Sequence, residues 1–232
     1  MPRPMPRAAP VTIATLMSVI ASFPSGSMCR HRCLRTNMPP TYIESDYIGK
    51  AHASHMQLAA YAGTYQGEGG GMLDDGGIHA IVNAYGADIL SHEQMQIERD
   101  SLQHGAVTTY EHSIAVACLS VKIADRLHLW HHVNLRSLVR AALLHDYFLY
   151  DWHEKDNGSH RLHGFRHPYT AERNARADFE LDDIVSNSIR THMFPLTPIP
   201  PKYLEGVIVN IADTLCAIRE TLSPSRFHAA KP

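Results

Sequence analysis

The chain has 232 residues, which is enough for one domain with extensions and a hydrophobic core of ordinary size. Lys and Arg total 21 against 23 Asp and Glu, so the net charge of −2 gives no indication of a nucleic-acid partner or a membrane surface. No apolar stretch is long enough to span a membrane. Histidine is the unusual component, because 17 copies of the commonest metal-binding side chain are present.

The cysteines give no indication of a disulfide framework. Cys118 and Cys216 lie in helical patterns and are expected to be small buried apolar residues. Cys29 and Cys33 have a spacing found in zinc sites, but no second pair follows, and we expect no zinc there. This cysteine usage is typical of a reducing compartment, and together with the missing span it predicts a cytoplasmic protein.

The N-terminal part of the chain has no clear period. Residues 1–45 are rich in Pro, Arg, Ser and Met. Residues 11–21 loosely resemble a signal peptide, but the apolar run is short and hydroxyl side chains interrupt it. We therefore favour a disordered extension, or coding sequence upstream of the true start, over a signal peptide. Residues 46–85 are expected to be a linker that contains a Gly-rich segment at 63–77 and has room for a short helix around 55–61.

Helical spacing of apolar residues dominates the rest of the chain and predicts an all-α domain over residues 86–221. The expected elements are a helix that ends near Gly105, followed by helices over 109–127, 135–146, 169–178, 181–192 and 203–219. Thr108 or Thr109 and Asn134 are suitable N-caps, and Pro168 suits the first turn of the helix that follows it. No segment of this half alternates like a strand, and residues 222–232 are expected to be a frayed tail.

Asp146 is the residue that this helical pattern does not explain. It follows His145 at the end of the helix predicted over 135–146, and it falls on the apolar stripe of that helix. A buried ionised carboxylate costs several kcal/mol unless it is paired or binds a metal ion. Four more polar residues lie on or beside the apolar faces of other segments, or begin one: His112, His167, His192 and Asp213.

These positions are best explained together. One histidine on an apolar face is usually a core residue with a satisfied hydrogen bond. Five such positions, with two carboxylates among them, are more simply explained by one shared partner. Histidine nitrogens with carboxylate oxygens suit zinc, manganese, iron, nickel or cobalt, whereas calcium and magnesium prefer oxygen-rich sites. The sequence therefore predicts a divalent metal site built from several helices.

The order of these residues resembles a known family. His112, His145-Asp146 and Asp213 follow the His, His-Asp, Asp order of the HD superfamily of metal-dependent phosphohydrolases, and the resemblance covers roughly residues 104–220. Its specific part is Tyr-Glu-His-Ser at 110–113 followed by Leu-Leu-His-Asp, because His-Asp alone is a weak signal. Further segments resemble a bacterial group of uncharacterised HD proteins: Gln-His-Gly at 103–105, Leu-His-Asp-Tyr-Phe at 144–148, Gly-Phe-Arg-His-Pro at 164–168 and His-Met-Phe-Pro-Leu at 192–196.

This resemblance implies a helical bundle with a metal site at its centre. By its pattern, four residues would bind a first metal ion: His112, His145, Asp146 and Asp213. Asp146 would bridge to a second ion held by His167 and His192. The implied cofactors are therefore two divalent metal ions of the kinds named above, and His145 and Asp146 are the implied catalytic residues.

The implied activity is cleavage of a phosphate ester, in a nucleotide or another small phosphorylated metabolite, by a metal-activated water. The Gly-Tyr-Pro signature of the cyclic-dinucleotide branch is absent, so that substrate is not expected. Four side chains close in sequence to His167 are candidates for substrate binding, with solvated surface charges as the alternative: Arg161, His163, Arg166 and Arg173. Two other functions stay open, namely a di-iron oxygenase of the same fold and a binding or sensor module without catalysis.

Overall fold

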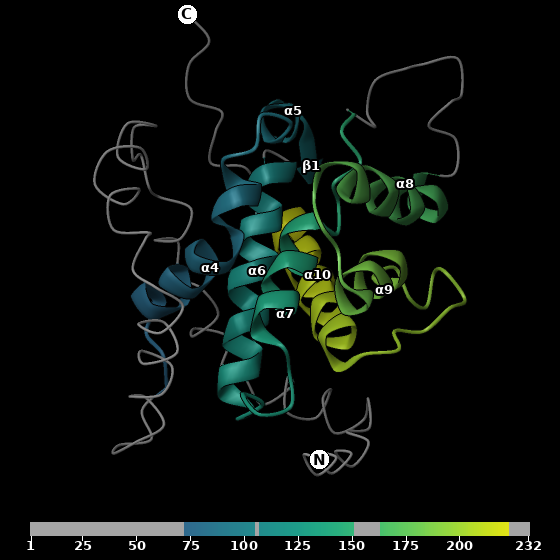
Figure 1. The fold of residues 1–232 in the computed structure, drawn as a ribbon. Coiled ribbons are helices and arrows are strands. Elements are labelled where there is room, and N and C mark those ends of the chain that lie inside the picture. The colour runs from purple at the N-terminus through teal and green to yellow at the C-terminus, as the bar shows by residue number, and fades with distance from the viewer. Residues whose placement is uncertain (1–71, 105–106, 151–162, 223–232) are drawn as a thin grey trace, which may run out of the picture.

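The computed structural model describes residues 72–104, 107–150 and 163–222. In chain order they form α4 (Asp75–Leu90), α5 (Met95–Asp100), β1 (Leu102–His104), β2 (Val107–Thr108), α6 (Thr109–Arg126), α7 (Leu135–Leu144), α8 (His163–Asp178), α9 (Asp183–Thr191) and α10 (Leu204–Leu222) (Figure 1). The prediction of an all-α fold is confirmed, since the antiparallel pair β1 and β2 is the only sheet in the described ranges. No described helix combines the length and apolar character that a membrane span needs.

Local hydrogen bonds encoded in the sequence fix where two central helices begin. Thr108 caps α6 through a capping box: its side chain accepts from the backbone N–H of Glu111 at 3.2 Å, and the Glu111 carboxylate accepts from the Thr108 N–H at 3.1 Å. Asn134 caps α7 by accepting from the backbone N–H of Ser137 at 3.1 Å. The predicted caps therefore lie where the structure begins these helices.

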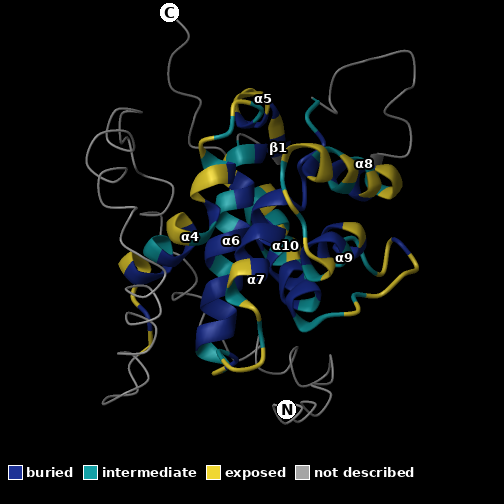
Figure 2. Ribbon diagram, in the orientation of Figure 1, coloured by how far each residue is buried: buried dark blue, intermediate teal, exposed yellow. Residues whose placement is uncertain are grey.

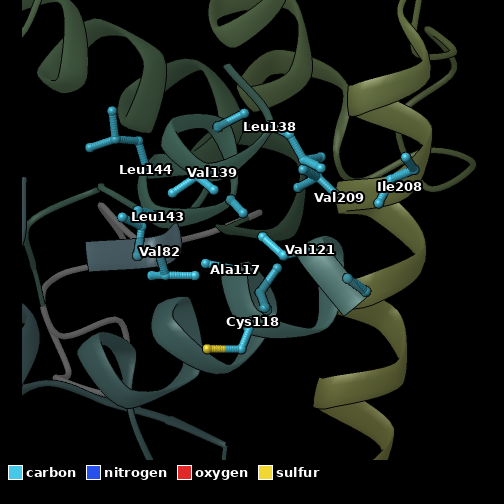
Figure 3. Packing of buried hydrophobic residues seen from close by; sticks show 14 of the residues in the cluster. Val82, Ala117, Cys118, Val121, Leu138, Val139, Leu143, Leu144, Ile208 and Val209 are labelled. Carbon is cyan, nitrogen blue, oxygen red and sulfur yellow. The ribbon is translucent and has the colours of Figure 1, made fainter. Parts of the chain in front are cut away.

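Helix α7 lies at the centre of the bundle. Its residues from Ser137 to Leu144 are all buried, because α4, α6, α9 and α10 pack around it (Figures 1 and 2). Burial on every side is typical of a core helix. Figure 3 shows Leu138, Val139 and Leu143 of this helix among apolar side chains of α4, α6 and α10. The C-terminal end of α7 therefore lies deep inside the protein, and the residues directly after it are buried too.

The last part of the range predicted as a linker is helical instead. Asp74 caps α4 by accepting from the backbone N–H of Gly77 at 2.8 Å, and Ile78 and Ile81 of this helix are buried in the core. Residues 75–85 are therefore helix, because a cap and a buried apolar stripe outweigh the low helix propensity of the glycines. The other N- and C-terminal expectations lie outside the described residues: the extension 1–45 with Cys29 and Cys33, the linker up to residue 71, and the tail from 223.

Two other predicted boundaries are wrong. The helix expected to end near Gly105 ends at Asp100 as α5, because the paired strands β1 and β2 then take up the backbone hydrogen bonds. Helix α8 begins at His163 instead of Tyr169, so Pro168 lies in its second turn and not in its first. Both corrections concern segments that lead into residues of the predicted metal site.

Candidate metal centre

The six residues predicted as metal ligands lie close together inside the bundle, although they come from five elements. Each of these elements places at least one side chain in the same region. His112 is in the first turn of α6, His145 is the C-cap of α7 with Asp146 after it, His167 is in α8, His192 is the C-cap of α9, and Asp213 is in α10. The four histidines and Asp146 are buried.

The side chains form two groups that share Asp146. The first group is His112, His145 and Asp146, and the second group is Asp146, His167 and His192. Within each group the three ligand atoms lie within 4.8 Å of one another. Atoms with this spacing and chemistry can hold a metal ion in each group.

Asp213 lies beside the first group and completes it. Its Oδ1 atom is 3.1 Å from His112 Nε2 and 3.7 Å from His145 Nε2. The Oδ2 atom of Asp146 lies 3.4 Å from His145 Nε2 and 4.0 Å from His112 Nε2. Two imidazole nitrogens and two carboxylate oxygens therefore face one small volume, from α6, α7 and α10.

The second group uses the other oxygen of Asp146. Its Oδ1 atom is 3.2 Å from His167 Nε2 and 3.5 Å from His192 Nε2. The two Nε2 atoms are 2.8 Å apart. Two nitrogens can bind one ion only if they lie closer than about 4.2 Å, which is twice a metal–nitrogen bond of about 2.1 Å. The spacing of His167 and His192 therefore suits two ligands of one ion, and each oxygen of Asp146 faces a different group.

Backbone hydrogen bonds set which ring nitrogen faces the centre. His145 Nδ1 donates to the carbonyl of Ala142 at 2.8 Å, and His192 Nδ1 donates to the carbonyl of Ile189 at 2.7 Å. A carbonyl only accepts, so the Nε2 atom of each neutral ring carries the lone pair that a metal requires. Within the described residues, His145 Nε2 and Asp146 Oδ1 are buried without a hydrogen-bond partner. Such unpartnered acceptors are costly, and a bound cation would satisfy both.

The carboxylates favour positive charge at the first group. Burial opposes protonation of His112, but its hydrogen bonds to Asp213 and Glu220 outweigh burial and raise its pKa to about 9. Burial likewise opposes protonation of His145, yet the nearby negative charges of Asp146 and Asp213 raise its pKa well above the usual range. In the metal-free protein, protons therefore occupy nitrogens that face the first group, and a metal ion must displace them.

In the second group, the pKa of a ligand histidine shifts in the opposite direction. Burial, with the nearby His167 and His145 rings, lowers the pKa of His192 to about 4. His192 is therefore neutral near pH 7, which is the state in which it can bind a metal. The donor set, the buried unpartnered acceptors and the local charge all fit divalent metal ions.

A comparison with protein families supports this reading of the geometry. The sequence model of the HD domain family matches residues 109–218, from the first residue of α6 into α10. This range is a little under half of the chain, and it contains both groups and Asp213. Residues 109–218 form an HD domain. The superfamily is of the metal-dependent hydrolase type. No curated protein and no solved structure matches the chain significantly.

Glu220 extends the centre of the HD domain along α10. Its Oε2 atom accepts from His112 Nδ1 at 2.8 Å, and its side chain is only 7% exposed. A carboxylate on the far nitrogen of a ligand histidine fixes the ring and makes it a stronger ligand. Glu220 is not among the site residues predicted from the sequence. Its position two helical turns after Asp213, on the same face of α10, is the signal that places it here.

We expect Glu220→Gln to weaken metal binding at the first group by about 10-fold, because the amide can still accept from His112 but carries no charge. Isothermal titration of the metal-free protein with Mn²⁺ measures this affinity. Glu180→Gln, the same change at an exposed glutamate, is the control and should bind Mn²⁺ like the wild type. Equal affinities in the two variants would show that Glu220 does not act on the ligand histidine.

Glu98 of α5 is a buried carboxyl that sequence reasoning missed. It is 1% exposed, and neither of its oxygens has a hydrogen-bond partner in the described part of the chain. Burial and then the charge of Asp146 raise its pKa well above the usual range, against the opposing effect of His145 and His112. The spacing of Glu98 three residues after the buried Met95 puts both on one face of α5, which is the available sequence signal.

We expect Glu98→Gln to stabilise the metal-free protein, by an amount that grows as the pH rises from 5 to 8. Because folding raises the pKa of Glu98, its contribution to stability is complete below its unfolded pKa of about 4.3 and is lost as the pH rises through the folded value. Glutamine does not ionise, so the variant should gain about 1–3 kcal/mol over the wild type at the upper end. Urea unfolding in the presence of a chelator at both pH values measures the difference.

The exposed Glu93, five residues earlier, provides the matched control for this prediction. Glu93→Gln makes the same chemical change in water and should alter stability by less than about 0.5 kcal/mol at either pH. A gain for Glu98→Gln that did not depend on pH would contradict the argument from ionisation.

Gln103 also contacts the centre, a role that the sequence did not predict. The segment 103–105 contributed only to the resemblance to HD proteins. From β1, its Nε2 donates to Asp146 Oδ2 at 2.5 Å. Thr109 Oγ1 donates to Gln103 Oε1 at 3.5 Å, which helps to fix the amide orientation. Gln103 therefore orients the carboxylate that the two groups share.

The two predicted substrate-binding residues whose side chains the structure describes, Arg166 and Arg173, are not part of the buried centre. Arg166 and Arg173 are both exposed on α8, and Arg166 is adjacent in sequence to His167. His163 begins α8, but its side chain lies outside what the structure describes, as does Arg161 altogether. The exposure of Arg166 and Arg173 suits anion binding at the surface of the HD domain as well as it suits solvated charges.

Proposed function

We propose that this HD domain is a metal-dependent phosphohydrolase, which cleaves the phosphate ester of a nucleotide or another small phosphorylated metabolite with an activated water. The observation that carries the proposal is the pair of adjacent ligand groups that share Asp146. A shared carboxylate between two ion sites is suited to phosphoryl groups, because a phosphate ester presents attacking and leaving oxygens that both need stabilisation.

The residues of the centre would hold two ions. The first group with Asp213 would hold one, and the second group would hold the other. Manganese, iron, nickel, cobalt and zinc match these nitrogen and oxygen donors. When bound, such ions lower the pKa of a coordinated water and neutralise developing charge on phosphoryl oxygens.

The protein itself contributes orientation and charge. The carbonyls of Ala142 and Ile189 hold protons on the outer nitrogens of His145 and His192, so the inner nitrogens stay available. Burial of these rings shields the ligand nitrogens from bulk water. An anionic substrate also needs cationic side chains, and we assign that role to Arg166 with its sequence neighbours His163, Arg161 and Arg173.

Elemental analysis of the purified protein, paired with a screen of phosphate esters for released phosphate, tests the proposal. We expect about two metal ions per chain, loss of hydrolysis after chelation, and recovery with Mn²⁺, Ni²⁺ or Co²⁺. His145→Ala is the control against a contaminating phosphatase, because contaminating activity would persist in that variant. Bound iron together with oxygen consumption and no phosphate release would show that the protein is an oxygenase and not a hydrolase. Metal binding without turnover of either kind would indicate a binding or sensor module.

A further inference from the structure

Asn174 holds the turn that follows Asp146. From α8, its Nδ2 donates to the carbonyl of Tyr147 at 3.3 Å and to the carbonyl of Phe148 at 3.0 Å. The turn is tight, because the Phe148 N–H bonds back to the carbonyl of Asp146 at 2.7 Å and Leu149 has a left-handed φ of 60°. That conformation is strained for a leucine, so the turn needs support from outside. The two N–H groups of one amide provide it.

Asn210 holds the turn at His192 in the same way. From α10, its Nδ2 donates to the carbonyl of His192 itself and to the carbonyl of Phe194, the second at 2.7 Å. His192 is the C-cap of α9, where carbonyls have lost their helical partners. One amide again satisfies two carbonyls of a turn that carries a residue of the centre.

Each asparagine belongs to a helix that also bears a residue of the centre. Asn174 follows His167 by seven residues on α8, and Asn210 precedes Asp213 by three residues on α10, so each pair lies on one helix face. Asn174 thus links the turn of Asp146 to the helix of His167. Asn210 links His192, in the second group, to the helix of Asp213, beside the first group.

We propose that Asn174 and Asn210 are positioning residues that fix the spacing between the two metal-binding groups. The proposal rests on the centre binding two ions, as argued above. Without Asn210, the turn at His192 loses its side-chain hydrogen bonds to α10, and His192 is no longer held at a fixed distance from Asp213. Without Asn174, the carboxylate of Asp146 is free to turn away from His167.

Substitution by aspartate tests this role, because Asp has the shape of Asn but puts an acceptor oxygen against the two carbonyls. Metal-free full-length protein is titrated with Mn²⁺ by calorimetry. We expect two binding events in the wild type. In Asn210→Asp and in Asn174→Asp, the second event should be weaker by about 10- to 100-fold, because removing a group that orients a metal ligand typically costs that much affinity. The first event should change less than the second in Asn210→Asp.

Asn187 provides a matched control in the same connection between α9 and α10. Its Oδ1 accepts from the backbone N–H of Lys202 at 2.9 Å, so Asn187→Ala loosens this connection without touching the turn at His192. We expect both Mn²⁺ affinities to stay at the wild-type values in Asn187→Ala. Thermal unfolding of each metal-free variant separates a general loss of stability from a loss of metal binding.

Several outcomes would overturn the proposal. Wild-type affinity for both ions in Asn210→Asp would do so, as would an equal weakening in Asn187→Ala. If Asn210→Asp does not fold, Asn174→Asp decides the question by the same comparison. A wild type that binds one Mn²⁺ or none would overturn it together with the two-ion centre. Normal binding of two ions without hydrolysis of any ester contradicts only the proposed function.

Discussion

Asp146→Ala should leave the purified protein without either metal ion and reduce phosphate-ester hydrolysis to the background rate. The reason is that Asp146 serves both groups: its Oδ2 lies 3.4 Å from His145 Nε2, and its Oδ1 lies 3.2 Å from His167 Nε2. Its removal takes one ligand and one negative charge from each group at once. Elemental analysis and a phosphate-release assay on the same preparation measure both effects.

The same variant should lose the stabilisation that metal ions give to the wild type. A ligand present at 100 times its dissociation constant stabilises the folded state by about 2.7 kcal/mol. Added Mn²⁺ should therefore raise the melting temperature of the wild type and leave that of Asp146→Ala unchanged. Because this comparison uses each protein with and without metal, it separates lost metal binding from any change in the stability of the metal-free fold.

Asp178→Asn is the matched control for Asp146→Ala. The Asp178 carboxylate accepts from the hydroxyl of Tyr147 at 3.0 Å, one residue from Asp146, but it belongs to neither group. This control should retain both ions. If Asp146→Ala kept one equivalent of tightly bound metal, the two groups would not share this ligand, and the bridging role would be wrong.

The helices of the HD domain were predictable from sequence because their signals are local. The Thr108 and Asn134 caps, and the apolar stripes of α6, α7, α9 and α10, depend only on residues a few positions apart. Polar residues that interrupt buried stripes could be recognised for the same reason. That these residues converge was predicted because one shared metal partner explains them together and because their order resembles the HD superfamily.

The groups that support the centre were not predictable, since their roles depend on contacts between distant segments. Gln103 reaches Asp146 only because β1 and β2 pair next to α6. Asn174 and Asn210 bind main-chain carbonyls of turns, and nothing in the sequence marks which carbonyls a turn exposes. Glu98 lies in a six-residue helix, where its spacing from Met95 is the whole of the periodic signal. The sequence thus encodes the ligands more visibly than the groups that orient them.

The glycines in the first turn of α4 misled the prediction of a linker for a related reason. Glycine lowers helix propensity by about 1 kcal/mol, which is a small local term. Burial of Ile78 and Ile81 against the core contributes more, about 1.5–3 kcal/mol for each side chain. Tertiary packing therefore decides the start of this helix, and composition alone does not.

His192→Ala should remove the second metal ion and leave the first in place. His192 lies in the second group alone, where its Nε2 is 2.8 Å from His167 Nε2. The first group and Asp213 keep all their ligand atoms in this variant. Metal content should therefore fall from about two equivalents to about one, and hydrolysis should fall by on the order of 10²-fold or more, since one of two stabilising charges is lost.

Two features make this variant a clean test of the binuclear arrangement. Asn210 holds His192 through its main-chain carbonyl, so alanine keeps the contact that fixes the turn. His131→Ala, at an exposed histidine, controls for loss of an imidazole as such and should keep both ions. One equivalent of metal in the wild type with no change in His192→Ala would exclude an ion at the second group. His167 and His192 would then be buried against each other without a cation, and the 2.8 Å between their nitrogens would need one ring to donate its proton to the other.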